Sequence, residues 1–175
     1  KRGKMKIKTL VLPVAAAAIF GLTSASFAVR EYKLHSTTDF SYLGNEEVEF
    51  YRDTKYRALA INAANPRYRN KWARAESTFS GGTASYDITI TTLTERDGES
   101  TFRVVVNGVE VGSFVNPETD QSFQQHSHTW SNIQVPEGAS IAVESIAHTN
   151  KKVEARVGTS WSRGRWRSLT LTRSK

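Results

Sequence analysis

The sequence predicts an all-β fold, an antiparallel two-sheet β-sandwich (jelly roll) of about ten strands. Three observations indicate this fold. Short runs with apolar residues at every second position recur along most of the chain, and glycine, asparagine and proline separate these runs. In addition, no segment of residues 29–175 repeats apolar residues at helical spacing. Internal repeats of the kind that propellers and solenoids need are missing from the sequence.

The first 28 residues are typical of a secretory signal peptide. Residues 1–8 form a basic run, residues 9–22 are apolar, and small residues precede a cut after Ala28. We therefore expect an exported protein, periplasmic or secreted, whose residues 29–175 form a single domain. No second apolar span follows residue 28, so we expect no membrane anchor.

Most of the excess positive charge lies in that leader. Residues 1–28 contain five Lys or Arg and no acid, so without them the formal net charge of +7 falls by five, to +2. A nearly balanced domain without a long Lys/Arg stripe is not typical of a nucleic-acid-binding protein, and we expect no nucleic-acid partner. The chain has no cysteine, so the hydrophobic core must hold the fold without disulfides.

The clearest strands lie between residues 84 and 114. Apolar residues alternate in residues 86–90 and again in 102–106, where Val105 makes the second face partly apolar and favours a central strand. Asn107-Gly108 then supplies the positive φ angles of a two-residue type I′ turn, which predicts a hairpin. We expect these three strands to form the centre of one antiparallel sheet, with an acidic turn at residues 95–99.

Shorter alternating runs predict the other strands. A basic and aromatic loop separates two of them at residues 63–71, and the longest polar connection covers residues 115–125. The predicted strands are residues 32–34, 47–51, 56–61, 72–79, 127–135, 140–146, 155–161 and 166–171.

Residues 75–88, AESTFSGGTASYDI, and the earlier Glu47-Val48-Glu49 resemble carbohydrate-binding modules of families 6 and 35. Those modules carry Glu-x-Glu in an early strand and a small-residue loop leading into a Tyr-x-apolar strand. The resemblance implies a jelly-roll, lectin-like domain that binds a glycan through aromatic residues in the loops at one end. It also implies a structural calcium near Glu47 and Glu49, although residues 165–169, RWRSL, lack the acidic ligand usual in the family's final strand.

The segment WSRGRW at residues 161–166 is the most concentrated candidate binding site. Flat aromatic faces suit the C–H side of sugar rings, and guanidinium groups suit hydroxyls, carboxylates or sulfates. We therefore expect Trp161, Arg163 and Arg165 to contact a polysaccharide, although the arginine stems also suit covering the sheet. Trp166 begins an alternating strand, so two interpretations stay open for it, a ligand contact and a core residue.

Further candidate ligand residues lie in other segments. Tyr68 belongs to the basic and aromatic loop, His148 follows a strand, and Trp130 stands between polar residues in a strand. Glu95 and Asp97 crowd carboxylates into one turn, where they suit sugar hydroxyls or a cation. Two simpler interpretations stay open: Trp130 as a core residue and the acidic turn as solvated surface.

The pair His126 and His128 lies on one face of an extended segment, which is a metal-ligand spacing. Cupin enzymes use this spacing together with an acidic residue a few positions on. Residues 129–136 contain no acid, so a histidine metal site is the weaker interpretation.

Three functional hypotheses follow, of which we prefer the first. It is an exported, non-catalytic carbohydrate-binding domain. The second is a small jelly-roll glycan lyase or hydrolase, with Tyr or His as the base and Arg neutralising a uronic carboxylate. The third is a structural or adhesive domain whose sheet edges pair with partners. No tight motif nominates a catalytic base, which favours binding over catalysis.

Overall fold

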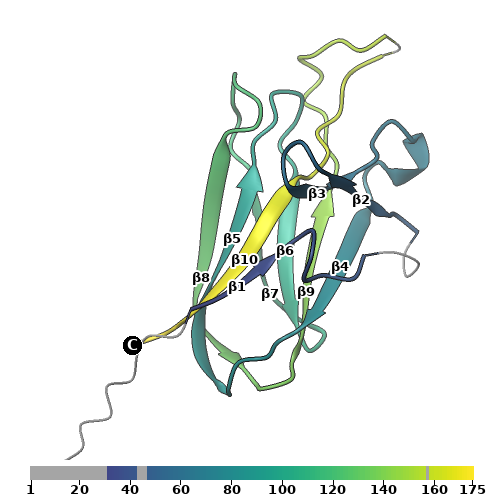
Figure 1. Cartoon of the computed structure of the whole chain (residues 1–175). Coiled ribbons are helices and arrows are strands. Elements are labelled where there is room, and N and C mark those ends of the chain that lie inside the picture. The colour runs from purple at the N-terminus through teal and green to yellow at the C-terminus, as the bar shows by residue number, and fades with distance from the viewer. Residues whose placement is uncertain (1–30, 43–46, 157) are drawn as a thin grey trace, which may run out of the picture.

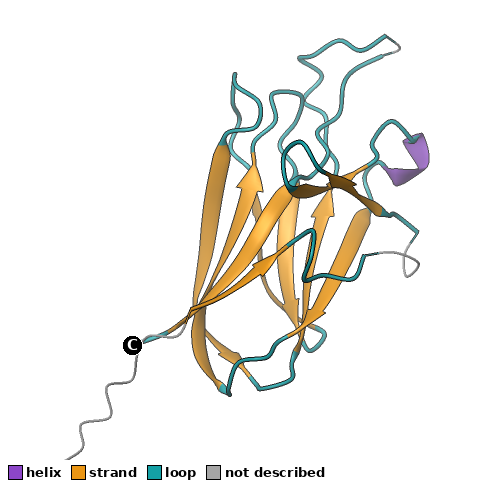
Figure 2. Ribbon diagram, viewed as in Figure 1, coloured by secondary structure: helices purple, strands orange, loops and turns teal. Residues whose placement is uncertain are grey.

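The computed structural model describes residues 31–42, 47–156 and 158–175. Across these residues, ten strands and one short 3-10 turn, η1 (Pro66–Tyr68), build two antiparallel sheets that face each other (Figures 1 and 2). The expected β-sandwich is thus confirmed. The expected signal peptide, residues 1–28, lies outside the described residues. Within the described ranges, no helix is long and apolar enough to cross a membrane.

The first sheet has six strands and the second has four. In the first, the order is β2-β3-β10-β5-β8, and β1 also pairs with β10. In the second, the order is β4-β9-β6-β7. The first sheet contains β1 (Glu31–His35), β2 (Phe50–Asp53), β3 (Ala58–Ile61), β5 (Ala84–Leu93), β8 (Gln125–Val135) and β10 (Trp166–Arg173), and the second contains β4 (Trp72–Thr78), β6 (Thr101–Val106), β7 (Val109–Val115) and β9 (Ser140–Ile146).

The last strand, β10, is central in the six-stranded sheet. Along one edge it pairs with β5, and along the other it pairs first with β3 and then with β1. The pair Glu31 and Thr172 closes the β1–β10 ladder. The start of β1 and the end of β10 thus lie together, at the end of the sandwich opposite the long loops (Figure 1).

The core lies between the sheets and follows from alternation along each strand. In β5, Ile88 and Ile90 are fully buried, whereas the intervening Thr89 is partly exposed on the outer face. Burying one such side chain stabilises the fold by about 1.5–3 kcal/mol. The largest side chains of this core include Trp166, Phe50, Phe79, Phe102, Leu59, Ile61, Ile141, Leu169 and Leu171.

The expected hairpin at Asn107-Gly108 is confirmed. Their φ angles are 49° and 81°, and β6 pairs with β7 on either side of the turn. The central position expected from Val105 is also confirmed, because β6 lies between β9 and β7.

The prediction that all three strands share one sheet is wrong. β5 pairs with β10 and β8, whereas β6 pairs with β7 and β9. The acidic segment 95–99 therefore crosses from one sheet to the other. Alternation shows which face of a strand is buried but does not identify the neighbouring strand.

Two other strand predictions need correction. In place of the strand expected at residues 155–161, the described residues 155–156 and 158–161 form no strand apart from one isolated bridge, Glu154 to Thr159, and Gly158 has a φ of 72°. The strand expected at residues 47–51 begins only at Phe50, so Glu47-Val48-Glu49 precedes it.

Candidate binding site at the loop end

Three connections gather at one end of the sandwich (Figure 1). They join β3 to β4, β5 to β6, and β9 to β10, the last covering residues 147–165. Between them lies a hollow of about 200 Å³, which we call the loop-end hollow. Its lining residues are Ala63, Ala64, Arg69, Asp97, Ala155, Thr159, Ser160, Trp161 and Arg163.

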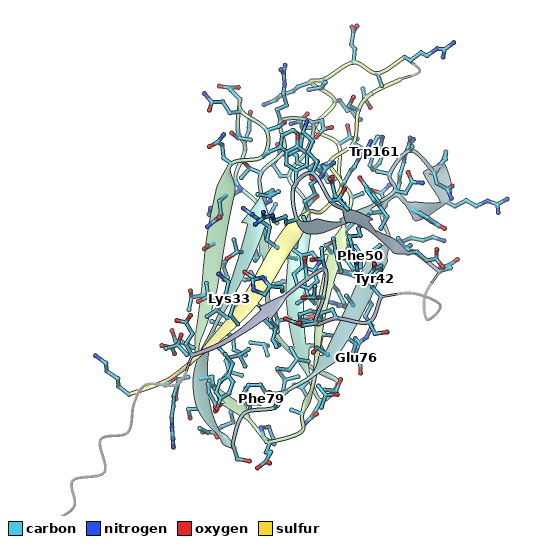
Figure 3. All side chains as sticks on the ribbon, viewed as in Figure 1. Lys33, Tyr42, Phe50, Glu76, Phe79 and Trp161 are labelled. Atoms are coloured by element: carbon cyan, nitrogen blue, oxygen red, sulfur yellow. The ribbon has the colours of Figure 1, made fainter. Side chains whose placement is uncertain are left out.

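Trp161 forms the aromatic wall of the loop-end hollow and lies at the loop end of the molecule in Figure 3. Its ring is partly buried against the rim of the core. The guanidinium carbon of Arg69 lies 4.9 Å from the ring centroid, and Arg69 Nε donates a hydrogen bond to the Ala63 carbonyl at 2.8 Å. This cation–π contact holds the indole in one orientation.

Arg163 supplies a second guanidinium to the loop-end hollow. Its Nη1 donates to the Tyr51 hydroxyl at 2.6 Å, and its backbone N–H donates to Glu95 Oε1 at 2.9 Å. Its carbonyl accepts from the Ile61 N–H at 2.7 Å. The backbone is thus anchored on two sides. Of the five N–H donors of the guanidinium, one has a partner in the described part of the chain.

Asp97 contributes a carboxylate to the same hollow. Its Oδ1 is buried and has no hydrogen-bond partner among the described residues. Burial raises the pKa of the Asp97 carboxyl above its ordinary value. A buried acceptor without a donor costs about 1–3 kcal/mol.

A buried charge network supports the loop-end hollow from below. Arg165 Nε donates to Asp53 Oδ2 at 2.9 Å, and Arg165 Nη1 contacts Glu95 Oε2. The guanidinium carbon also lies 5.1 Å from the ring centroid of Phe123, which stacks on Tyr56. Burial raises the pKa of Glu95 to about 7 and outweighs the attraction of Arg165. Arg165 and Glu95 therefore have partners within the fold and do not line the hollow.

The other predicted ligand residues lie apart from the loop-end hollow. Trp166 is fully buried in the core, as its alternative interpretation predicts. Tyr68 packs against the core from η1, and its neighbour Arg69 reaches the hollow. His148 is exposed, and its Nδ1 accepts the Glu99 N–H at 3.3 Å.

Trp130 lies where β8 faces β7, at the open edge between the two sheets. The ring of Phe114 in β7 meets the Trp130 ring edge-on, with 5.9 Å between their centroids. It also stacks on the His128 ring, with 4.5 Å between centroids. Burial, reinforced by the neighbouring His126, lowers the pKa of His128. These side chains form an aromatic cluster in which His126 and His128 pack against rings.

Around Glu47 and Glu49, the described residues do not gather a set of calcium ligands. Glu47 is largely exposed, its Oε1 lies 2.7 Å from Lys71 Nζ, and Glu49 is exposed as well. In the described ranges, no group of three or more His, Cys, Asp or Glu could hold a metal ion.

The comparisons of the sequence with known proteins gave little information about its family. No family model matches the sequence. One curated relative, Uncharacterized protein P23 of Formosa agariphila, is 30% identical over 125 residues, which are 70% of this chain. The chain spans only 27% of that protein's length.

Solved structures are more informative about architecture. A family 36 carbohydrate-binding module of a xylanase from the hindgut metagenome of Trinervitermes trinervoides covers 83% of this chain and 99% of its own, with a TM-score of 0.52 and 11% identity. The C-terminal family 6 module of a laminarinase from Zobellia galactanivorans covers 82% and 100%, with a TM-score of 0.51 and 15% identity.

The fold is that of the carbohydrate-binding modules. A Podospora anserina β-(1,4)-mannanase with GH26 and CBM35 parts also matches, with a TM-score of 0.50 and 13% identity over 83% of this chain and 28% of its own. At these identities the likeness concerns the fold alone. The family 6 and 35 resemblance is confirmed at that level.

Proposed function

We propose that the chain is an exported, non-catalytic carbohydrate-binding domain that holds a polysaccharide in the loop-end hollow. The observation that carries this proposal is that the aromatic residue Trp161, the basic residues Arg69 and Arg163 and the acidic residue Asp97 line one hollow. A sugar ring offers the hydroxyl donors that Asp97 needs and the C–H face that suits an indole.

Each lining group has a distinct part in such recognition. The Trp161 indole packs against the ring, Asp97 accepts from a hydroxyl, and Arg163 donates to hydroxyl or ring oxygens. Arg69 holds the indole in place through its stacking contact. Because these groups sit on anchored backbone, the site is largely preformed.

Binding is favoured over glycoside hydrolysis by the carboxylates. Hydrolysis uses a pair of carboxyl groups about 5–9.5 Å apart that flank the bond. Within the described residues, Asp97 is the only acid that lines the loop-end hollow, and the carboxylate of Glu95 is bound by Arg165 and the Arg163 backbone. The solved neighbours belong to a xylanase, a laminarinase and a mannanase, so xylan, laminarin and mannan are the first glycans to try.

Affinity electrophoresis of residues 29–175 tests the proposal. The gels contain xylan, laminarin, mannan or an acidic polysaccharide, each with calcium and with chelator. We expect retardation on at least one glycan that Trp161→Ala removes. Trp72→Ala is the matched control. Trp72 is also partly buried, and the guanidinium carbon of Arg103 lies 4.1 Å from its ring centroid, but Trp72 belongs to β4 and does not line the hollow.

Three results would overturn the proposal. They are no retardation on any glycan, equal loss in both tryptophan variants with the fold intact by circular dichroism, and release of new reducing or unsaturated ends. The last would establish the enzyme hypothesis instead. Self-association without glycan binding would favour an adhesive role.

A further inference from the structure

A second hollow, of about 210 Å³, lies on the outer face of the six-stranded sheet. We call it the sheet-face hollow. In Figure 3, Lys33, one of its residues, lies about midway along the sandwich, whereas Trp161 lies at the loop end. None of its lining residues lines the loop-end hollow. They are Lys33, His35, Arg57, Thr91, Gln125, Arg167 and Ser168, which include three permanent cations and no acid.

Strand pairing between the two ends of the described chain builds one side of this hollow. In β1, Tyr32 and Leu34 pack toward the core, so Lys33 and His35 face outward. His35 pairs with Ser168 of β10. The β1–β10 ladder therefore places the two basic side chains of β1 beside the start of β10.

A β-bulge brings Arg167 to the same place. The register between β10 and β5 shifts between Trp166 and Ser168, so Arg167 is the extra residue. Trp166 points into the core, Ser168 lies opposite Thr91, and Arg167 and Ser168 both line the sheet-face hollow. Bulges commonly re-aim a side chain in this way.

Arg57 reaches the hollow from a third direction. It lies in the turn between β2 and β3 with a φ of 50°, a left-handed conformation that is uncommon for residues other than glycine, asparagine and aspartate. Cations thus converge from β1, from this turn and from β10.

These cations form no ion pair in the described part of the chain. None of Lys33, Arg57 and Arg167 forms a salt bridge with a described carboxylate, whereas the arginines of the opposite sheet are paired, as Arg74 is with Glu144 at 2.7 Å. The nearby Asp39 accepts the His35 backbone N–H and does not line the hollow. Positive charges gathered in one place repel each other, which costs electrostatic free energy. A bound anion would replace this repulsion with attraction.

We propose that the sheet-face hollow binds a tetrahedral oxyanion group, the sulfate ester of a sulfated polysaccharide. Three cations that converge from different elements suit an anion whose charge is spread over three terminal oxygens. Thr91, Ser168 and Gln125 add neutral hydrogen-bonding groups. The site is independent of the loop-end hollow, so either can fail while the other stands.

The experiment measures binding of residues 29–175 to dextran sulfate and to unsulfated dextran by isothermal titration calorimetry. We expect binding to dextran sulfate only, weakened at least tenfold by Lys33→Ala/Arg167→Ala. The control, Arg173→Ala/Lys175→Ala, removes the same charge from exposed positions outside the hollow and should change the Kd less than threefold. Trp161→Ala should leave this binding unchanged.

Two further arms identify the group that is recognised. Inorganic sulfate should compete with dextran sulfate more strongly than chloride at equal ionic strength. Polygalacturonate, which carries carboxylates, should bind at least tenfold more weakly. Equal weakening in both double variants, equal competition by chloride, or equal binding of polygalacturonate would overturn the proposal.

Discussion

The guanidinium of Arg165 and the carboxylate of Glu95 form an ion pair that is buried beneath the loop-end hollow. Their side chains are only 7% and 5% exposed. Asp53 Oδ2 accepts from the same guanidinium at 2.9 Å. The pair therefore ties β2 and the β5–β6 crossing to the start of β10, and it fixes the segments that carry Asp97 and Arg163.

Removing Arg165 should destabilise the protein strongly. Arg165→Leu leaves Glu95 and Asp53 buried without their cation, and breaking a buried ion pair in this way costs about 3–5 kcal/mol. Urea unfolding followed by tryptophan fluorescence measures the loss. Adding Glu95→Gln and Asp53→Asn should restore part of it, and a loss below about 1 kcal/mol in the single variant would contradict a structural role.

Stability should fall as the pH rises through the range in which Glu95 titrates. Burial raises the pKa of Glu95 from 4.5 to about 7, so the folded state holds the proton more tightly than the unfolded state. The stability that the tightly held Glu95 proton contributes is complete below pH 4.5. It is lost as the pH rises to about 7, which lowers the free energy of unfolding by about 3 kcal/mol. Melting temperatures from pH 4 to 8 check this. Glu95→Gln lacks the titrating group, so its curve should be flatter; parallel curves would refute the assignment.

Asp97→Ala should separate stability from binding. Because Oδ1 is buried and without a described partner, its removal should leave the free energy of unfolding unchanged or raise it by about 1 kcal/mol. Retardation on glycan gels should disappear. A variant that is destabilised by more than about 2 kcal/mol would show that Asp97 is structural rather than a ligand acceptor.

Gly98→Ala should disrupt the loop-end hollow from the side. A Cβ at Gly98 would lie 2.2 Å from the His148 carbonyl oxygen, so the β5–β6 and β9–β10 connections would have to separate. We expect a lower melting temperature and weaker glycan retention. Gly82→Ala is the matched control, since its Cβ would meet no atom within 4 Å, and equal effects in both variants would exclude this steric cause.

The sequence predicted most of the strands because alternation and turn residues are local properties. The hairpin at Asn107-Gly108 depends only on neighbouring residues, and it is present. The sheet to which β5 and β6 belong depends on partners far along the chain. Alternation contains no such information, which is why the three strands were expected in one sheet.

The loop-end hollow was partly predictable. Trp161 and Arg163 stand in one segment with evident sugar-binding chemistry, and Asp97 stands in a conspicuous acidic turn. Arg165 and Trp166 have the same composition but point into the fold, since the strand that buries Trp166 begins there. A prediction from composition alone cannot tell which side of the chain faces solvent.

The sheet-face hollow could not be predicted from the sequence. Lys33 and Arg167 stand near opposite ends of the domain, and they meet only because β1 pairs with β10. The bulge that re-aims Arg167 has no signature in its residues. Both causes are properties of tertiary structure.

The pairing of Glu31 with Thr172 also governs how the domain can be attached to something else. The start of β1 and the end of β10 lie at the end of the sandwich opposite the long loops (Figure 1). A fluorescent reporter or a surface linker joined after residue 175 would therefore project from the far side and leave the loop-end hollow accessible. The strand order therefore allows the domain to be immobilised through its C-terminal end with the loop-end hollow facing outward.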